Sequence, residues 1–214
     1  MIVSKDLLSR KGTRMRDRMS APERRQLIIQ AALTLFSQKG FRGTTTREIA
    51  RAAGVSEATI FKHFATKEAL YSAIIDTKAR AEEVLVAAGE AAAARDDAAV
   101  LTAVATTIFS RVEKDPAFMR LLLYSALEGH ALSEMFFATQ VRRTHGFLAD
   151  YIASRIQEGG FRPVDPLLAA RGFIGTAVHY LLIHELFGVP RPAHLGSGEV
   201  IALYVEIFLR GLRP

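Results

Sequence analysis

The stretch that decides the fold is residues 44–70, TTTREIARAAGVSEATIFKHFATKEAL. Two short helix-forming segments flank Gly54, which can take the positive φ that a sharp turn needs. Ala50 is small enough to let two helices cross closely. Four apolar residues are spaced to form a small core between them: Ile49, Ala53, Val55 and Ile60. This pattern predicts a helix-turn-helix unit.

Capping signals on both sides of this stretch predict four helices. Ser20 with Glu23 and Thr45 with Glu48 form capping boxes, and Gly40 is a stop signal. Single caps at Ser56 and Thr66 start two more helices. The expected spans are 22–39, a short helix from 45 that ends at 54, 56–64, and a long one from 66 toward 95.

The remainder of the chain also has helical signals and almost no strand alternation. Asp115-Pro116 is an N-cap followed by Pro in the first helical position, and Asp165-Pro166 is a second start of this kind. Gly159-Gly160 ends a helix that begins near Ser133. The further expected spans are 98–114, from 116, 133–159, 166–187 and 199–212. The fold class is therefore all-α with about nine helices: a three-helix helix-turn-helix domain followed by a second helical domain.

Charge is distributed unevenly along the chain. Residues 1–70 carry 14 Lys and Arg against 6 Asp and Glu, a net +8, whereas residues 71–214 carry 14 against 16, a net −2. A basic module joined to a near-neutral one favours a polyanion such as DNA as partner. We expect a basic arm at 1–20, a DNA-binding domain at 21–70 and a ligand-binding and dimerisation domain at 71–214.

The second helix of a helix-turn-helix unit lies in the major groove. The exposed residues of this second helix, the residues around the start of the first helix, and Lys67 are therefore the candidates for DNA contact. Thr59 can bond a base edge, Lys62 can reach phosphate or guanine, and Lys67 can bind a phosphate. The full set is Arg42, Thr44, Thr45, Thr46, Arg47, Glu57, Ala58, Thr59, Phe61, Lys62, His63 and Lys67. Glu57 could read a cytosine amino group, only discriminate against wrong sites, or only support the helix N-terminus through the helix dipole.

Residues 21–70 resemble the N-terminal domain of TetR-family transcription regulators. The motifs are a Gly40-Phe41 step, a Thr cluster, I-A-x-x-A-G-V-S, an aromatic-x-H-F and K-E-x-L. Phe61 departs from the family, which most often has Tyr there. The resemblance implies an all-helical homodimer that binds double-stranded operator DNA. It also implies repression, with release from DNA when a small molecule binds.

Residues 71–214 then become the ligand-binding and dimerisation domain. Candidate pocket residues for a small apolar ligand are Phe109, Phe118, Leu122, Met135, Phe137 and His145. The helices expected at 166–187 and 199–212 are apolar beyond one stripe, which fits a dimer bundle. The candidate interface residues are Phe173, Val178, Leu181, Tyr204 and Phe208. Packing within one subunit is the alternative for both sets.

Other functional classes have little support in the sequence. The chain has no Cys, no metal-ligand pattern and none of the common catalytic or phosphate-binding motifs, so we expect neither an enzyme nor a cofactor. The apolar stretch 173–189 is broken by His179, His184 and Glu185, which argues against a membrane partner. We expect a bacterial, cytoplasmic, nucleoid-associated protein. A structural module with a vestigial helix-turn-helix, or an activator of the same fold, are the alternatives.

Overall fold

The computed structural model describes residues 19–78, 81–129 and 131–214, and it leaves out the side chains of residues 81–85, 131–132, 135 and 139–140. The predicted basic arm therefore lies outside the described residues, apart from its last two. The chain divides into two compact units, with the boundary between Ile74 and Ile75. Each unit has its own core, as described below.

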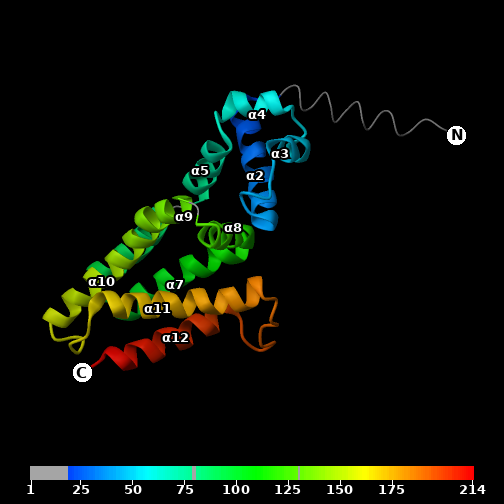
Figure 1. The fold of residues 1–214 in the computed structure, drawn as a ribbon. Coiled ribbons are helices and arrows are strands. Elements are labelled where there is room, and N and C mark those ends of the chain that lie inside the picture. The colour runs from blue at the N-terminus through cyan, green and yellow to red at the C-terminus, as the bar shows by residue number, and fades with distance from the viewer. Residues whose placement is uncertain (1–18, 79–80, 130) are drawn as a thin grey trace. The chain divides into compact units, whose positions relative to one another are not determined.

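The first unit contains three complete helices and the start of a fourth. α2 spans Ala21–Lys39, α3 Thr46–Ala53, α4 Glu57–His63, and α5 (Lys67–Lys78) crosses the unit boundary (Figure 1). Both predicted capping boxes are present, at the starts of α2 and α3. The two predicted stops also take positive φ, 72° at Gly40 and 65° at Gly54. Local chemistry therefore fixes where these helices begin and end.

Three aromatic rings form the centre of the first unit's core. The Phe36 ring centroid lies 5.6 Å from that of Phe41 and 4.9 Å from that of Tyr71, and the Phe41 and Tyr71 centroids are 5.2 Å apart. Ile49 of α3 and Ile60 of α4 are buried in the same unit. Aromatic pairs at such separations add stability beyond their buried area, so the three rings hold α2, the loop after it and α5 together.

The second unit is also entirely helical in its described part. Its α-helices are α6 (Ala81–Ala93), α7 (Asp97–Lys114), α8 (Pro116–Leu127), α9 (Ala131–Phe136), α10 (Arg142–Gln157), α11 (Pro166–Leu181) and α12 (Ser197–Leu212). The π-helical turn η1 (Phe137–Val141) joins α9 to α10, and η2 (Leu182–Leu186) extends α11. Helices α7, α10, α11 and α12 share one core that includes Phe109, Ile152 and Phe173.

The all-α prediction is confirmed, and the described residues hold ten continuous helices, close to the expected nine. The helix expected from residue 66 toward Arg95 corresponds to α5 and α6, which are counted separately because residues 79–80 between them lie outside the described residues. Asp115 also differs from expectation, because its carboxylate makes no capping hydrogen bond to α8. It accepts one from the Lys78 ammonium at 2.6 Å instead. Asp165, by contrast, caps α11 as predicted.

By length and composition alone, α11 with η2 could cross a membrane, since its mean hydropathy is 1.4 over a membrane-sized window. A single helix of this kind is weak evidence, because core helices have the same composition. Phe173, Ile174 and Leu181 of α11 are buried in the core of this unit. The helix is therefore already part of a packed bundle.

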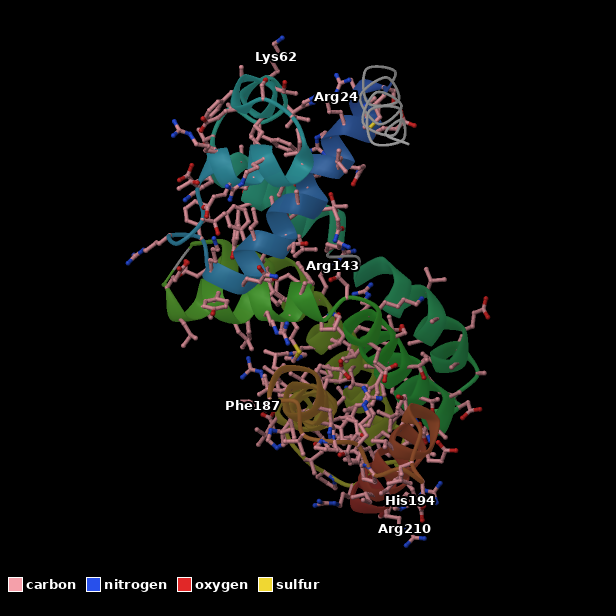
Figure 2. The ribbon with its side chains drawn as sticks, turned by 90° about the vertical axis from the view of Figure 1, so that its right-hand side faces the viewer. Arg24, Lys62, Arg143, Phe187, His194 and Arg210 are labelled. Atoms are coloured by element: carbon pink, nitrogen blue, oxygen red, sulfur yellow. The ribbon has the colours of Figure 1, made fainter. Side chains whose placement is uncertain are left out.

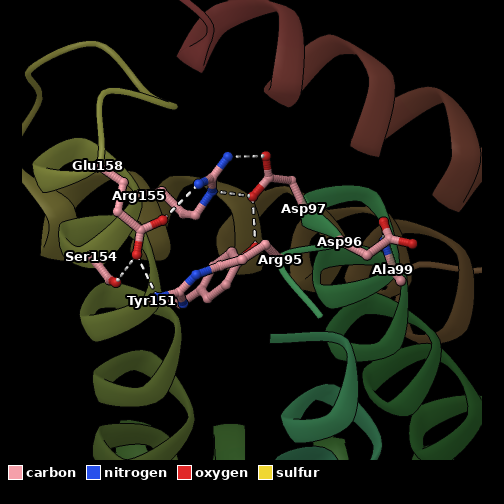
Figure 3. Close-up of polar contacts among 8 residues, drawn as sticks. All are labelled: Arg95, Asp96, Asp97, Ala99, Tyr151, Ser154, Arg155 and Glu158. Atoms are coloured by element: carbon pink, nitrogen blue, oxygen red, sulfur yellow. Dashed lines mark hydrogen bonds and ion pairs between the residues drawn. The ribbon is translucent and has the colours of Figure 1, made fainter. Parts of the chain in front are cut away.

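A polar network joins the start of α7 to the end of α10 (Figure 3). The Asp97 carboxylate accepts hydrogen bonds from the Tyr151 hydroxyl at 2.6 Å and from Arg155 Nε at 2.8 Å. Arg155 also donates to Glu158, which pairs with Arg95. Burial, with the hydrogen bond to Asp97, raises the pKa of the Tyr151 hydroxyl. The network therefore fixes the start of α7 against the last turns of α10.

We predict that Asp97→Ala lowers the free energy of unfolding by about 1–3 kcal/mol, because it leaves a half-buried guanidinium and a hydroxyl without their shared acceptor. Urea denaturation at one fixed protein concentration would measure the loss. The control is Asp150→Ala. Asp150 is an exposed residue of α10, and a substitution at such a surface position should change the free energy of unfolding by no more than about 0.5 kcal/mol. Equal losses for both variants would show that the network adds nothing.

Candidate nucleic-acid interface

The short helix α4 is held in place at both of its ends. Ser56 Oγ accepts a hydrogen bond from the Thr59 backbone N–H at 3.1 Å, and the Ser56 and Thr59 hydroxyls lie 2.8 Å apart. Ile60 and Phe64 are buried, and the Arg25 guanidinium lies 4.9 Å from the centroid of the Phe64 ring. A helix of this length needs such external support, because an isolated one is unstable in water.

The opposite side of α4 faces solvent. Ala58 and Lys62 are exposed, and Phe61 is 48% exposed although it is a large apolar residue. Lys62 projects away from the rest of the first unit in Figure 2. His63 is half-buried, and its ring centroid lies 6.4 Å from that of Phe64. The structure therefore brings four of the six predicted α4 residues together on one accessible surface, which we call the α4 surface (Ala58, Thr59, Phe61, Lys62).

The three consecutive threonines have three different environments. Thr44 is buried, and its hydroxyl donates to the Gly40 carbonyl at 2.9 Å, so its side chain supports the loop instead of facing DNA. Thr45 is the N-cap of α3 and accepts from the Glu48 N–H at 3.2 Å. The Thr46 hydroxyl donates to the Glu57 carboxylate, so it joins α3 to α4.

The Lys67 ammonium is engaged within the unit. It donates to the carbonyls of Phe41 and Thr44 at 2.8 and 2.9 Å, and it lies 4.1 Å from the centroid of the Phe41 ring. These contacts occupy N–H donors that a phosphate would otherwise use, and they fix the loop before α3. In this structure Lys67 is thus a support for the interface, and a phosphate contact would need these bonds to rearrange.

The other predicted cations lie at the surface. Arg42 and Arg47 are exposed, and Arg47 Nε is 3.9 Å from the Glu57 carboxylate. Lys39, which the sequence did not single out, donates to Glu48 at 2.6 Å. That bond, with those from Thr45, lowers the pKa of Glu48 to about 2. Glu48 therefore stays ionised at neutral pH and ties the end of α2 to the start of α3.

Sequence reasoning also missed a hollow beside α4. Arg24 of α2 and Thr59 of α4 line it together with Met19, Leu27, Ala53, Gly54 and Val55. Arg24 donates to the Met19 carbonyl at 3.2 Å and lies at the outer end of α2 in Figure 2. One signal in the sequence could have drawn attention to Arg24. It lies one turn after the Ser20 cap, where the helix dipole does not favour a cation.

The predicted pocket residues of the second unit do not share one environment. Phe109 is fully buried and its ring stacks on that of Tyr180, with centroids 5.5 Å apart. Phe118 contacts Phe136, and Phe137 is 61% exposed. Leu122 and His145 are half-buried, and burial beside Arg171 lowers the pKa of His145. The side chain of Met135 lies outside the described residues.

The predicted dimer residues divide into buried and accessible groups. Phe173 and Leu181 are 2% and 0% exposed, so the subunit's own core already covers them. Val178 is exposed, and Tyr204 and Phe208 are half-buried. Leu203 and Ile207 of α12 are exposed beside them, and so is Leu168 of α11, which the sequence did not single out. Helical periodicity shows which residues share a face, but it does not show which of two apolar faces packs inside the subunit.

Two hydroxyl groups in the second unit are buried without a hydrogen-bond partner in the described part of the chain: Ser125 Oγ and Tyr180 Oη. Around the Tyr180 ring lie His184, Tyr204 and the Arg191 guanidinium, which donates to Glu113 at 2.7 Å and also pairs with Glu185. Among the described residues, no group of His, Asp and Glu side chains could hold a metal ion.

Comparisons with known proteins agree with this organisation. Residues 28–74 match the family model of bacterial regulatory proteins of the tetR family. Residues 98–212 match the model of the AefR-like transcriptional repressor C-terminal domain. The transcriptional regulator RutR of Escherichia coli is 31% identical over 89% of this chain and 91% of its own. The regulator AcrR of Shigella flexneri is 47% identical over 57 residues, which cover 27% of this chain and 26% of AcrR.

Solved structures share the fold across both units. The ketosteroid transcriptional regulator KstR2 of Mycobacterium tuberculosis has a TM-score of 0.65 and 22% identity, covering 91% of this chain and 97% of KstR2. AibR in complex with isovaleryl coenzyme A and operator DNA has a TM-score of 0.62 and 24% identity, covering 90% and 99%. With the two family models and the RutR match, these findings show that the chain belongs to the TetR family of DNA-binding transcriptional regulators.

Proposed function

We propose that the chain is a repressor whose first unit reads operator DNA with the α4 surface. The observation that carries this proposal is that a short, doubly supported helix exposes Phe61 and Lys62 from a basic unit. Thr59 and Lys62 would contact bases or phosphates, and Arg42 and Arg47 would contact the backbone. An activator would bind DNA in the same way, whereas a vestigial module would bind no DNA selectively.

A homodimer would bring two α4 surfaces to one operator, as dimeric helix-turn-helix proteins do. We revise the proposed dimer surface to the exposed residues of α11 and α12: Leu168, Gly172, Gly175, Val178, Leu203 and Ile207. A Cβ atom built on Gly172 or Gly175 meets nothing within 4 Å in the subunit. The two glycines therefore leave open space against which a second copy can pack closely.

The effector that releases the protein from DNA would bind in the second unit. Its buried Ser125 and Tyr180 hydroxyls are unpaired in the described part of the chain, and buried polar groups in native proteins normally have a partner. An amphiphilic effector, apolar with a neutral hydrogen-bonding group, would satisfy one or both. AibR was solved with isovaleryl coenzyme A, which combines an apolar acyl group with polar atoms. Ligand and DNA would then weaken each other's binding by the same factor.

The cellular location follows from the function. A regulator of this kind acts on chromosomal DNA, so we expect it in the bacterial cytoplasm, associated with the nucleoid. The family is regulatory, and the chemistry of the α4 surface offers no catalytic constellation.

For DNA reading, we predict that Thr59→Ala weakens binding to the operator upstream of the chain's own gene by about 1–3 kcal/mol, with little change on unrelated DNA. Lys62→Ala should weaken both and reduce the salt slope by about 1 if it contacts phosphate. Fluorescence anisotropy over a salt series would separate the two roles. Wild-type protein that shows no preference for any duplex would support a vestigial module.

For assembly, we predict that Gly175→Leu makes the protein monomeric at micromolar concentration and abolishes operator binding. The subunit itself should stay folded, because Leu favours helix over Gly by up to about 1 kcal/mol and meets open space. Gly89→Leu on α6, also without neighbours within 4 Å, is the matched control and should stay dimeric. Analytical ultracentrifugation would measure the oligomeric state of both variants. If Gly175→Leu remained dimeric, the interface would lie elsewhere.

For the effector site, we predict that Tyr180→Phe leaves the melting temperature of the ligand-free protein unchanged or raises it, because the lost hydroxyl had no partner. Tyr151→Phe, which loses a 2.6 Å bond to Asp97, should lower the free energy of unfolding by about 1 kcal/mol. Calorimetry of both variants tests the contrast. An equal loss in both would mean that the Tyr180 hydroxyl is satisfied without a ligand.

A further inference from the structure

Glu57 is the only acidic residue of α4, and it stands at the start of the helix that carries the α4 surface. Its side chain is 38% exposed. α4 does not need it as a cap, because Ser56 already accepts the Thr59 N–H. A carboxylate beside a surface that approaches phosphates is unfavourable for DNA affinity. The helix dipole favours an acidic residue in the first turn of α4, but it does not account for the contacts that the carboxylate makes with α3.

The carboxylate is held by the first turn of α3. One oxygen accepts a hydrogen bond from the Thr46 hydroxyl, and the other lies 3.9 Å from Arg47 Nε. The Arg47 side chain is 89% exposed, so this ion pair is loose and can be broken. Glu57 therefore holds the Thr46 hydroxyl and lowers the effective charge of Arg47, and both groups could otherwise contact phosphate.

This arrangement weakens binding that depends on phosphates alone. Such binding is the same on every sequence and grows with the number of cations that displace counterions. On DNA, the unfavourable effect of a carboxylate can be compensated only by a hydrogen-bond donor. In the major groove, Glu can accept a hydrogen bond from the amino group of cytosine. Selectivity is the difference between two affinities, and it rises when the weaker one is suppressed.

We propose that Glu57 is a specificity-determining residue that suppresses non-specific DNA binding through Thr46 and Arg47 and recovers the loss at a cytosine in the operator. The inference rests on the proposed function of the α4 surface. It assigns Glu57 a role distinct from affinity: removal of its charge should make the protein bind DNA more tightly and less selectively.

The test compares wild type with Glu57→Gln on two duplexes: the site that the wild type selects from a random library, and a shuffled duplex of the same composition. Gln keeps the length and an oxygen that can accept from Thr46. Glu57→Gln should bind the shuffled duplex roughly three- to tenfold more tightly, with a log–log salt slope steeper by about 0.9. Its selected sites should lose the preference for one C·G pair.

Two further variants assign the mechanism. Glu90→Gln makes the same charge change at an exposed residue of α6 and should leave both affinities unchanged. Arg47→Ala should weaken binding to the shuffled duplex more in the Glu57→Gln background than in wild type, because Glu57 no longer offsets Arg47. The inference is overturned if Glu57→Gln keeps the wild-type shuffled-duplex affinity and site preference. A wild type that selects no site would instead refute the proposed function.

Discussion

The carboxylate of Glu48 fixes the position of the helix that precedes α4. It accepts hydrogen bonds from the N–H and hydroxyl of Thr45 and from the Lys39 ammonium at the last residue of α2. α3 is only eight residues long and needs external support to hold its place in water. Glu48 attaches its start to α2, and the left-handed turn at Gly54 then sets the direction in which α4 leaves it. The aromatic contacts of Phe36, Phe41 and Tyr71 join α2 and the loop after it to α5.

Helix boundaries in the first unit could be predicted because their causes are local. A capping box involves only four consecutive residues, and a positive φ at a helix end requires only one glycine. Both signals can therefore be recognised in the sequence. Contacts between distant residues leave no such signal. Asp115 was expected to cap α8, but its partner Lys78 is 37 residues away. Lys67 and Thr44 likewise turn toward the chain's own carbonyls, although their position in the motif suggested DNA.

The second unit was predicted well in its helices and less well in its surfaces. Phe173 and Val178 are both apolar residues of α11, yet one lies in the core and the other faces solvent. The sequence pattern does not distinguish a face that packs in the subunit from one that packs on a partner. The structure makes the distinction, and it also finds buried hydroxyls at Ser125 and Tyr180 that composition could not reveal.

The carboxylate at the start of α4 also bears on how copies of the protein distribute in a cell. A bacterial chromosome offers about 10⁶ or more competing non-specific sites, and these retain most copies of any strongly basic DNA-binding protein. A regulator that adheres less to such sites keeps more copies free and spends less time on each wrong encounter. In the role that we propose for Glu57, one negative charge beside Arg47 would shorten the search for an operator and lower the number of molecules needed to keep it occupied.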